Sequence, residues 1–453
     1  MKQKRRLFGT DGIRALANKE PMDSYTVLKL GQALAYHISR DGNKNKKILI
    51  GKDTRISGYM LEYALVSGIC SMGVTAQLVG PLPTPGIAFM TRGMRADAGI
   101  QISASHNPFE DNGIKIFGPD GFKLPDEVED EIESLMFSDK LDSLRAGPTE
   151  IGKAVRIDDA VGRYIAYLKG CFHRTFKLDG KKIVLDAANG AAYKVAPMVF
   201  RELGAEVILV GDQPNGVNIN DGVGSLYPEN IAHLVVKHKA DIGISLDGDA
   251  DRVILVDEKG QVVDGDQLLA ALAVYFKNAG ELENDTVVGT VQSNLGLEIF
   301  LKEHGIEFVR TDVGDRYILE RMVADGYNLG GEQSGHFILL DYNTTGDGIL
   351  SALMFLYIMK SSGKSVSQLT GAMKTVPQIL INIKVLSKPP LETLPKIQEE
   401  IKAAQAQLAD TGRLLLRYSG TENKIRVMVE AQDEALCKSV AEKLAEVVRE
   451  ELA

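Results

Sequence analysis

Cysteine is scarce in this sequence, and the few cysteines present lie far apart in the chain. They are Cys70, Cys171 and Cys437. An odd number of widely spaced cysteines forms neither a disulfide framework nor the paired spacing of a metal site. We therefore expect reduced thiols, as in a protein of the cytoplasm.

Long apolar runs are missing as well. The longest apolar stretch, at residues 349–359, is shorter than the roughly 20 residues that span a bilayer. The basic N-terminal letters KQKRR lead directly into LFGTDG, without the apolar segment of a secretory signal. We expect a cytoplasmic protein that has no membrane partner.

Positive charge is in deficit. The chain has 52 Lys and Arg against 61 Asp and Glu, which gives a net charge of −9. Apart from the N-terminal KQKRR, the sequence has no basic block, and this argues against a nucleic-acid partner. An anionic substrate would need a local group of positive side chains.

The size and composition are those of a multidomain globular protein. A chain of 453 residues is far longer than one hydrophobic core supports, so we expect several domains. Hydrophobic residues make up 44% and charged residues 25%, which is ordinary for a globular protein. Strand signals alternate with helix signals along the chain, which predicts an α/β fold.

One strand–turn–helix pattern occurs three times. The copies KILIGKDTRISG, KIVLDAANGAA and TVVGTVQSNLG each pass from a β-branched strand into a polar turn with glycine. They occupy residues 47–58, 182–192 and 286–296. A helix follows each copy and ends at a glycine before a second strand, which is the usual helix–strand junction. The pattern predicts three related α/β domains.

Each copy also has a polar loop after a later strand. The loops are ADAGIQISASHNP, ADIGISLDGDADR and YNLGGEQSGH, and the first two lead into hairpins with turns at residues 118–121 and 257–260. When one glycine in each loop is aligned, three side chains fall in register: Ser105, Asp249 and His336. Because ligands bind at the carboxyl ends of strands in open α/β sheets, we expect these loops to carry the site.

The C-terminal part has a different order of elements. A strand at 376–385, a helix at 396–409, two strands within 412–430 and a final amphipathic helix predict a separate fourth domain. We expect the proline-containing segment SKPPLE, residues 387–392, to be the linker into it. The expected domain boundaries are 1–157, 158–257, 258–374 and 375–453.

The loop LDGDADR places carboxylates at alternate positions, at Asp247, Asp249 and Asp251. Such close carboxylates repel one another unless they bind a cation or a proton, and oxygen ligands favour Mg²⁺ or Ca²⁺. A solvated acidic turn is the simpler alternative, but apolar flanks predict burial. An EF-hand is excluded because Arg252 replaces the turn glycine and a strand follows. An arginine beside a metal suits a phosphoryl group.

The loop SASHNPFEDNGIKIF contains Ser105 next to His106. A Ser-His-Asp esterase is not expected, because adjacent residues seldom face each other and no GxSxG turn is present. A plain polar turn at the Asn-Pro pair is an alternative. Opposite three aspartates and a metal, the serine could instead accept and donate a phosphoryl group, with Arg252 and Lys115 supplying positive charge.

Four motifs, SASHNP, DGDADR, GEQSGH and RYSGTEN, carry a resemblance over the whole chain. In their order and spacing the sequence resembles the α-D-phosphohexomutase superfamily. FGTDGIR at 8–14 and IGKDTRISGYMLE at 50–62 are most similar to its bacterial branch that acts on glucosamine phosphates. The resemblance implies three related α/β/α domains with mixed sheets and a C-terminal α+β domain that closes the cleft.

The same resemblance implies an isomerase that interconverts glucosamine 6-phosphate and glucosamine 1-phosphate, on the route to UDP-N-acetylglucosamine. A phosphoserine at Ser105 and a sugar 1,6-bisphosphate, as intermediate and activator, would carry the phosphoryl group. One Mg²⁺ per subunit would be held by Ser105, Asp247, Asp249 and Asp251. A homodimer is compatible with the resemblance.

Further site residues are implied in the same way. Glu332 and Ser334 would hydrogen-bond the sugar hydroxyls, and Arg14 would also bind substrate. The non-reacting phosphate would be held by Arg417, Ser419, Gly420, Thr421 and Arg426. The candidates for moving protons are Lys115 and His336, with His106 as a weaker one that would only orient Ser105.

Three alternatives remain open at this point. A member of the superfamily that acts on glucose or mannose phosphates would share these motifs. A phosphatase with Asp247 as nucleophile would be expected to have a Thr or Val at the position that Asp251 occupies in this sequence. A non-catalytic sugar-phosphate sensor would have no need of Ser105, the aspartates and Lys115 together.

Overall fold

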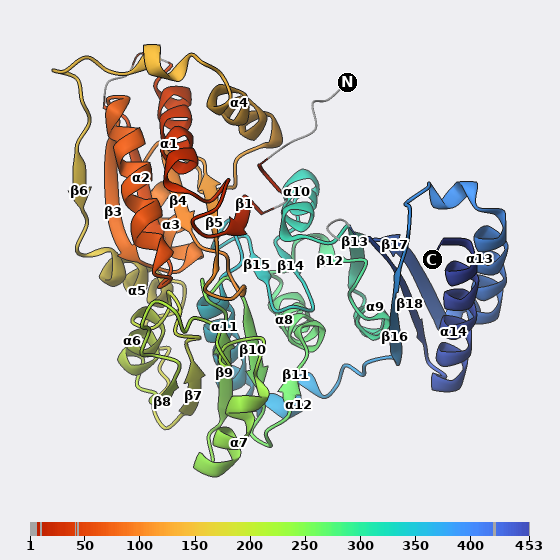
Figure 1. The fold of residues 1–453 in the computed structure, drawn as a ribbon. Helices are drawn as coiled ribbons and strands as arrows, with labels where there is room; N and C mark the ends of the chain where they lie inside the picture. The colour runs from red at the N-terminus through yellow and green to blue at the C-terminus, as the bar shows by residue number, and fades with distance from the viewer. Residues whose placement is uncertain (1–6, 10, 41, 43–44, 420–422, 453) are drawn as a thin grey trace.

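The structure is a computed structural model, and it describes residues 7–9, 11–40, 42, 45–419 and 423–452. Figure 1 shows four domains: the first three pack around a common centre, and the fourth, in blue, stands at one side. Three of the sheets mix parallel with antiparallel strands, and the C-terminal sheet is antiparallel. The α/β class predicted from the alternating strand and helix signals is confirmed.

The first domain is built on a six-stranded sheet with the order β1-β5-β4-β2-β3-β6. Strand β5 pairs antiparallel with both of its neighbours, whereas β2 pairs parallel with β3 and β4. The strands are β1 Ile13–Leu16, β2 Lys47–Lys52, β3 Thr75–Pro81, β4 Ala98–Ile102, β5 Asp111–Phe117 and β6 Ala154–Arg156. The helices are α1 Ser24–Ser39, α2 Ser57–Ser71, α3 Thr84–Gly93 and α4 Asp126–Met136.

The second domain has a five-stranded sheet with the order β11-β10-β9-β7-β8. Its strands are β7 Lys182–Asp186, β8 Glu206–Val210, β9 Ile242–Leu246, β10 Val253–Val256 and β11 Val262–Val263. Its helices are α5 Ala160–Gly170, α6 Val195–Glu202 and α7 Glu229–His238. The predicted turn at 257–260 joins β10 to β11, where the amide of Asp257 donates to the carbonyl of Gln261.

The third domain has a four-stranded sheet with the order β13-β12-β14-β15. Its strands are β12 Thr286–Thr290, β13 Glu307–Thr311, β14 Leu329–Gly331 and β15 Phe337–Leu339. Its helices are α8 Gly265–Ala279, α9 Leu295–Glu303, α10 Asp315–Asp325, α11 Gly348–Ser362 and α12 Val366–Thr370. The GEQSGH loop is itself the turn between β14 and β15, so this copy also contains a hairpin, which the sequence had indicated only for the first two.

The strand orders show that the three domains repeat one unit. In each, a hairpin partner, a third strand, a first strand and a second strand lie side by side, as β5-β4-β2-β3, β10-β9-β7-β8 and β15-β14-β12-β13. The three aligned glycines occupy equivalent places: Gly99 pairs with Leu49, Gly243 with Val184 and Gly330 with Val288. The predicted register between the three loops therefore follows from the sheets themselves.

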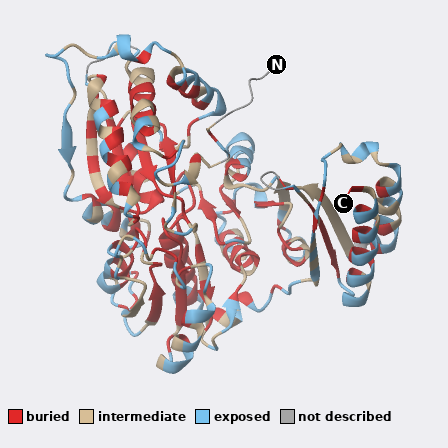
Figure 2. Ribbon diagram, in the orientation of Figure 1, coloured by how far each residue is buried: buried red, intermediate tan, exposed pale blue. Residues whose placement is uncertain are grey.

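The first three domains share a hydrophobic core, and the fourth has its own. One buried cluster extends from Leu49 to Met373 and joins the first three domains, a second lies within the first domain at residues 8–141, and a separate one lies within residues 383–452. The longest apolar stretch forms α11, which is buried on nearly all sides and contacts α8, β9 and β10. Burial all round explains why this helix lacks a polar face. Figure 2 shows the buried residues in red along the strands and the helix faces that cover them.

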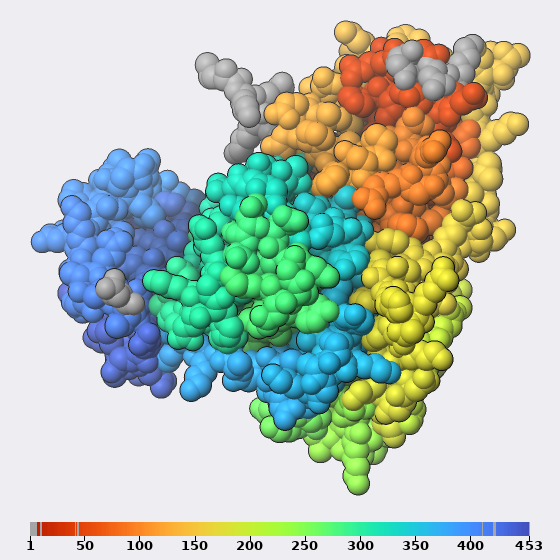
Figure 3. Space-filling view, turned by 180° about the vertical axis from the view of Figure 1, so that it is seen from behind, coloured from red at the N-terminus to blue at the C-terminus, as the bar shows by residue number. Residues whose placement is uncertain are grey.

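The fourth domain contains an antiparallel sheet with the order β16-β18-β17 under two helices. Its elements are β16 Gln378–Lys384, α13 Pro395–Leu408, β17 Gly412–Tyr418, β18 Lys424–Ala431 and α14 Glu434–Leu452. Short 3₁₀ turns occur at Leu141–Leu144, Glu283–Asp285, Leu391–Thr393 and Ala409–Thr411. Figures 1 and 3 both place this domain beside the third one.

The predicted linker SKPPLE is in the wrong place. Strand β16 precedes it and pairs along its whole length with β18, so residues 387–392 lie inside the fourth domain. Within them, the side chain of Lys388 donates to the carbonyl of Ser419. The connection between the third and fourth domains is residues 371–377, where the amide of Val376 donates to Asn294 Oδ1 at 2.8 Å.

No helix in the described part of the chain is both long enough and apolar enough to cross a membrane.

Candidate active site

A cleft of about 510 Å³ opens where the first three domains meet. The first domain contributes Arg14, the second Asp251 and Arg252, and the third Glu332, Ser334 and His336. These six are all residues that the sequence had marked as candidates.

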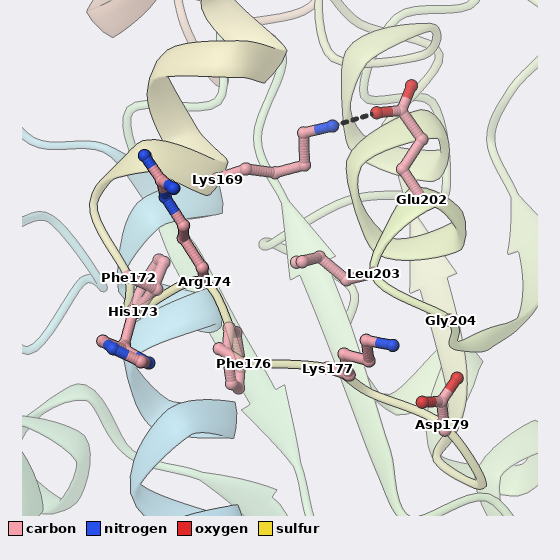
Figure 4. A pocket seen from close by; sticks show the side chains of 11 residues that line it. Lys169, Phe172, His173, Arg174, Phe176, Lys177, Asp179, Glu202, Leu203 and Gly204 are labelled. Carbon is pink, nitrogen blue, oxygen red and sulfur yellow. Dashed lines mark hydrogen bonds and ion pairs between the residues drawn. The ribbon is translucent and has the colours of Figure 1, made fainter.

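A larger hollow of about 830 Å³ lies elsewhere, beside the ends of α5 and α6 (Figure 4). Lys169 is already paired with Glu202 at 2.5 Å there, and Figure 4 marks no other interaction among the residues drawn. Size alone therefore does not identify the site, and the smaller interdomain cleft holds the chemistry.

Ser105 follows β4 and is almost fully buried, with its Oγ donating to Asp247 Oδ2 at 2.6 Å. Its φ of 53° lies in the left-handed region, which costs a residue other than glycine on the order of 1 kcal/mol. The surrounding contacts must therefore hold this conformation. The plain polar turn considered from the sequence does not describe so enclosed a serine.

His106 lies closer to the serine than its adjacent position suggested, with Nδ1 3.3 Å from Ser105 Oγ. Burial, together with the positive charges of Arg252 and Arg14, lowers the pKa of His106 to about 4. The imidazole is therefore neutral near pH 7 and can orient the serine through a hydrogen bond.

The three aspartates lie on the loop after β9 and are buried, with exposures of 0%, 0% and 4%. One oxygen from each lies within 4.8 Å of the others. Burial and the charges of Asp251 and Asp249 raise the pKa of Asp247 well above its usual value. The exposed acidic turn considered from the sequence is therefore wrong.

Two oxygens of this cluster suit a metal. Within the described residues, Asp249 Oδ1 and Asp251 Oδ1 are buried and receive no hydrogen bond. Buried carboxylate oxygens without donors are costly unless a cation binds them. An all-oxygen set of this kind fits a hard cation such as Mg²⁺.

Lys115 projects from β5 into the same cluster. Its Nζ lies 3.0 Å from Asp249 Oδ2 and 2.8 Å from Asp251 Oδ2. Burial alone lowers the pKa of Lys115. The negative charges of Asp11, Asp249 and Asp251 outweigh this effect and raise the pKa well above its usual value. Lys115 is therefore a buried ammonium group, because the carboxylates compensate its charge.

Arg14 and Arg252 give the cleft positive charge. Arg14 on β1 pairs with Asp11, and the amide of Arg252 donates to Asp247 Oδ1 at 3.2 Å. In the part of the chain that is described, the buried Nε atoms of both guanidinium groups lack a hydrogen-bond acceptor. Unused donors on two arginines are suited to an anion such as a phosphate.

The GEQSGH loop of the third domain faces the aspartates across the cleft. Glu332 accepts hydrogen bonds from the amide of Gly314 at 3.2 Å and from Ser334 Oγ at 3.3 Å. The amide of Val253 on β10 donates to the carbonyl of Gly335, which ties the loop to the second domain. The loop is thus tied to β10 of the second domain, and Glu332 is tied to Gly314, the residue before α10.

His336 lies deeper, between two carboxylates. Its Nδ1 is 3.7 Å from Asp251 Oδ1 and its Nε2 is 3.5 Å from Asp315 Oδ2. Burial alone lowers the pKa of His336, but the nearby carboxylates of Asp251 and Asp315 raise it. The three loops that carry Ser105, Asp249 and His336 therefore meet, as their register predicted.

The predicted phosphate-binding residues lie in the fourth domain, outside this cleft. Arg417 on β17 pairs directly opposite Arg426 on β18, and burial together with Arg426 lowers the pKa of Arg417. The amide of Ser419 donates to the carbonyl of Lys424 at 2.8 Å, next to the last pair of β17 and β18. Gly420 and Thr421 lie outside the described residues. Two facing guanidinium groups repel each other until an anion binds between them.

Sequence reasoning missed several residues of the site. Lys123 bridges Asp11 of the first domain and Asp315 of the third, with Nζ 2.6 Å from Asp315 Oδ2. Gln292 lines the cleft from the loop after β12, and Thr84 Oγ1 donates to Asp249 Oδ2 at 2.6 Å. Asp11 lies in a motif that had been noted, but isolated residues such as Lys123 and Thr84 carry no local signal.

Known proteins match this architecture. The α/β/α domain I, II and III models of the phosphoglucomutase/phosphomannomutase family match residues 5–143, 162–260 and 264–376, and its C-terminal domain model matches residues 380–447. The chain belongs to this family.

Named relatives resemble the whole chain. Phosphoglucosamine mutase of Syntrophotalea carbinolica is 57% identical over 99% of this chain and 98% of its own length. The protein of the same name from Bdellovibrio bacteriovorus is 54% identical over 100% of both chains. These relatives confirm the superfamily that the four motifs indicated and the bacterial branch that FGTDGIR and IGKDTRISGYMLE indicated.

Solved structures share the fold. A phosphoglucomutase/phosphomannomutase family protein from Burkholderia thailandensis superimposes with a TM-score of 0.81 at 23% identity, over 97% of both chains. N-acetylphosphoglucosamine mutase of Aspergillus fumigatus, in complex with GlcNAc-6P and magnesium, gives a TM-score of 0.68 at 19% identity. The match covers 99% of this chain and 96% of that one. The predicted arrangement of three α/β domains and a C-terminal α+β domain is thereby confirmed.

Proposed function

We propose that the protein is a phosphoglucosamine mutase, an isomerase that interconverts glucosamine 6-phosphate and glucosamine 1-phosphate. Full-length relatives at 54–57% identity carry this name. The observation that carries the reaction is the buried contact of 2.6 Å between Ser105 Oγ and Asp247 Oδ2, beside two further aspartates and Lys115. A hydroxyl placed against a cation site is suited to carrying a phosphoryl group.

Asp247, Asp249 and Asp251, together with the phosphorylated Ser105, would hold one Mg²⁺ per subunit. The two buried aspartate oxygens without hydrogen bonds support this assignment. When bound, the ion supplies positive charge to the phosphate oxygens. Arg252 and Lys115, both next to Asp251, add fixed positive charge from the protein.

The first transfer moves the phosphoryl group from Ser105 to the sugar. The free hydroxyl of the sugar phosphate attacks phosphorus, the bond from phosphorus to Ser105 Oγ breaks, and the hydroxyl proton passes to His336, the proposed acceptor. The Oγ that departs takes up a proton, and Lys115, held as an ammonium by its carboxylate neighbours, is the proposed donor. His106 and His336 are the other groups proposed to orient or move protons.

The second transfer requires the sugar 1,6-bisphosphate to turn around in the cleft. Its other phosphoryl group then passes to Ser105, which releases the isomeric monophosphate and restores the phosphoserine. The same bisphosphate would activate an enzyme that has lost its phosphoryl group. Because both ends of the sugar must react at one serine, the site must bind either end of the bisphosphate equally well.

The remaining candidates bind the sugar and its distal phosphate. Glu332 and Ser334 are proposed to hydrogen-bond the sugar hydroxyls, and Arg14 to hold a phosphate in the cleft. The fourth domain would close with its own phosphate contacts: Arg417, Ser419, Gly420, Thr421 and Arg426. Closure by a separate domain excludes water from the phosphoserine during transfer.

The experiment that tests the function compares three substrates. Glucosamine 6-phosphate, glucose 6-phosphate and mannose 6-phosphate are turned over side by side, with the sugar 1,6-bisphosphate and Mg²⁺ present. We expect the highest kcat/KM for glucosamine 6-phosphate. A higher value for glucose or mannose phosphate would instead assign the protein to the hexose-phosphate enzymes of the superfamily.

Two companion measurements separate the remaining classes. Intact-mass spectrometry should find one phosphoryl group on the purified protein, at Ser105, as a mutase requires and a sugar-phosphate sensor does not. Inorganic phosphate release from the sugar phosphates should be far slower than isomerisation, whereas a phosphatase with Asp247 as nucleophile would show the opposite. Light scattering tests a homodimer, and cell fractionation tests the cytoplasmic location that we also propose.

A further inference from the structure

The backbone of Ser105 is held on both sides by buried side chains. Its amide donates to Ser103 Oγ at 3.0 Å. Its carbonyl oxygen accepts two hydrogen bonds, from Arg55 Nη2 at 2.8 Å and from Asn220 Nδ2 at 2.9 Å. Because the φ of Ser105 is 53°, these contacts maintain a conformation that serine seldom adopts.

Arg55 is the centre of the contacts within the first domain. It lies just before α2 in the KDTRISG segment, and its side chain is completely buried. Besides the carbonyl of Ser105, its guanidinium group donates to the carbonyls of Asn107 at 2.9 Å and Pro108 at 2.5 Å. One planar cation therefore holds three carbonyl groups of the serine loop.

These contacts close into a ring. Arg55 Nε pairs with Asp53 Oδ2 at 2.9 Å, and the same oxygen accepts from Ser103 Oγ at 2.6 Å. Ser103 in turn receives the amide of Ser105, whose carbonyl returns to Arg55. All four side chains are at most 1% exposed, so water does not compete for the hydrogen bonds of the ring.

Asn220 makes matching contacts from the second domain. It lies between β8 and α7, is 7% exposed, and donates to the carbonyls of Ser105 at 2.9 Å and Asn107 at 3.0 Å. Arg55 holds the same two carbonyls from the opposite domain. The aspartate loop passes over this point, because a Cβ added to Gly248 would lie 2.5 Å from the carbonyl oxygen of Ser105.

We propose that Arg55 and Asn220 are positioning residues that hold the peptide of the phosphoserine from two domains. Neither side chain lines the substrate cleft, so both act on the reaction through Ser105. The inference rests on the proposed role of Ser105 as phosphoryl carrier. In this proposal, Arg55 and Asn220 keep Ser105 Oγ in the same position beside the aspartates in every transfer.

The physical reason is that Ser105 belongs to a loop without a helix or strand to support it. Rotation of its peptide would carry Oγ away from Asp247, and a displacement of about 1 Å at a reacting atom can slow a reaction on the order of 100-fold. Sugar binding depends on other residues across the cleft. Loosening the clamp should therefore slow phosphoryl transfer without weakening substrate binding.

The test uses Asn220→Ala in the full-length protein, with Mg²⁺ and the sugar 1,6-bisphosphate present. We expect kcat for glucosamine 6-phosphate to fall by about 10-fold or more, while KM changes by less than about 2-fold. The rate at which the bisphosphate phosphorylates Ser105, followed by intact mass, should fall by a similar factor. A purely structural role would lower the melting temperature but leave kcat per folded, phosphorylated site unchanged.

Two further variants address the chemistry of the contact. Asn220→Asp keeps the size of the side chain but replaces the donor with an oxygen that faces two carbonyls, so it should be at least as slow as Asn220→Ala. Arg55→Lys keeps the charge but cannot hold three carbonyls, and it should show the same fall in kcat at constant KM. The control is Asn218→Ala in the same loop, because among the described residues the Asn218 side chain bonds only to residues 213 and 215.

Normal kcat in Asn220→Ala and Asn220→Asp would overturn the proposal. So would a large rise in KM with unchanged kcat, since this would make Asn220 a substrate-binding residue. Failure of the proposed function itself is recognised separately. In that case the wild-type protein would carry no phosphoserine and would show no mutase activity.

Discussion

Ser105 Oγ donates a hydrogen bond of 2.6 Å to Asp247 Oδ2, although the two residues are 142 positions apart and belong to different domains. The serine comes from the loop after β4 and the aspartate from the equivalent loop after β9. Two copies of one structural unit thus supply the two halves of the proposed phosphoryl-transfer site. The predictions below test each part of that site.

Ser105→Ala should abolish mutase activity and phosphorylation of the protein, because the phosphoryl group loses its carrier. Coupled turnover assays and intact-mass spectra measure the two effects. Ser134→Ala, on the exposed side of α4, is the matched control and should behave as wild type. Phosphorylation that persists in Ser105→Ala would place the carrier on another residue.

Asp249→Asn should weaken Mg²⁺ binding, on the order of 10- to 100-fold or more, because it removes one charge from the cluster. In the wild type, Mg²⁺ at 100 times its Kd should increase the free energy of unfolding by about 2.7 kcal/mol. The melting temperature should rise as a result. Calorimetry with and without Mg²⁺ measures both effects.

Asp158→Asn, at an exposed position, is the control for charge alone and should keep the full Mg²⁺ response. A wild-type melting temperature that does not respond to Mg²⁺ would argue against a metal site at the three aspartates.

Arg417→Ala should raise KM and lower kcat together, since the distal phosphate both recruits the sugar and positions its reacting hydroxyl. The loss should be on the order of 2–4 kcal/mol of transition-state stabilisation. Kinetics on fully phosphorylated protein measure it, and Mg²⁺ binding should stay normal. Arg449→Ala, on the exposed face of α14, is the control. An unchanged kcat/KM would remove the fourth domain from phosphate binding.

Asp266→Asn should stabilise the protein at alkaline pH. Burial raises the pKa of Asp266 to about 7, and its Oδ1 has no hydrogen-bond partner within the described residues. Because this folded-state pKa exceeds the unfolded value of about 4, the carboxyl favours folding at low pH and loses that contribution as the pH rises from about 4 to 7. Above pH 7, the buried charge should cost on the order of a few kcal/mol.

Asparagine keeps the oxygen that accepts from the amide of Asn294 but carries no charge. The melting temperature of Asp266→Asn should therefore exceed that of the wild type at pH 8, by a margin that shrinks toward pH 5. Asp158→Asn should show no such dependence. A margin that is constant with pH would mean that Asp266 is ionised with an ordinary pKa.

Local sequence patterns were sufficient for the repeated domains. β-Branched strands, polar turns and glycines at helix ends are set by short-range sterics, so the three copies could be recognised and aligned before the sheets were known. The same alignment placed Ser105, Asp249 and His336 in equivalent loops, and the strand pairing bears this out. The misplaced linker shows the limit. SKPPLE contains a local turn signal, but only the pairing of β16 with β18 decides to which domain the preceding strand belongs.

The sequence by itself determined the domain repeat and the reactive groups: a serine, three aspartates and the cations near them. Only the tertiary structure decided which groups face one another. Lys123 contacts Asp11 in the first domain and Asp315 in the third. Asn220 of the second domain donates to the carbonyl of Ser105 in the first. These contacts join residues more than 100 positions apart. Their geometry depends on how whole domains pack, and short-range preferences of the chain do not encode it.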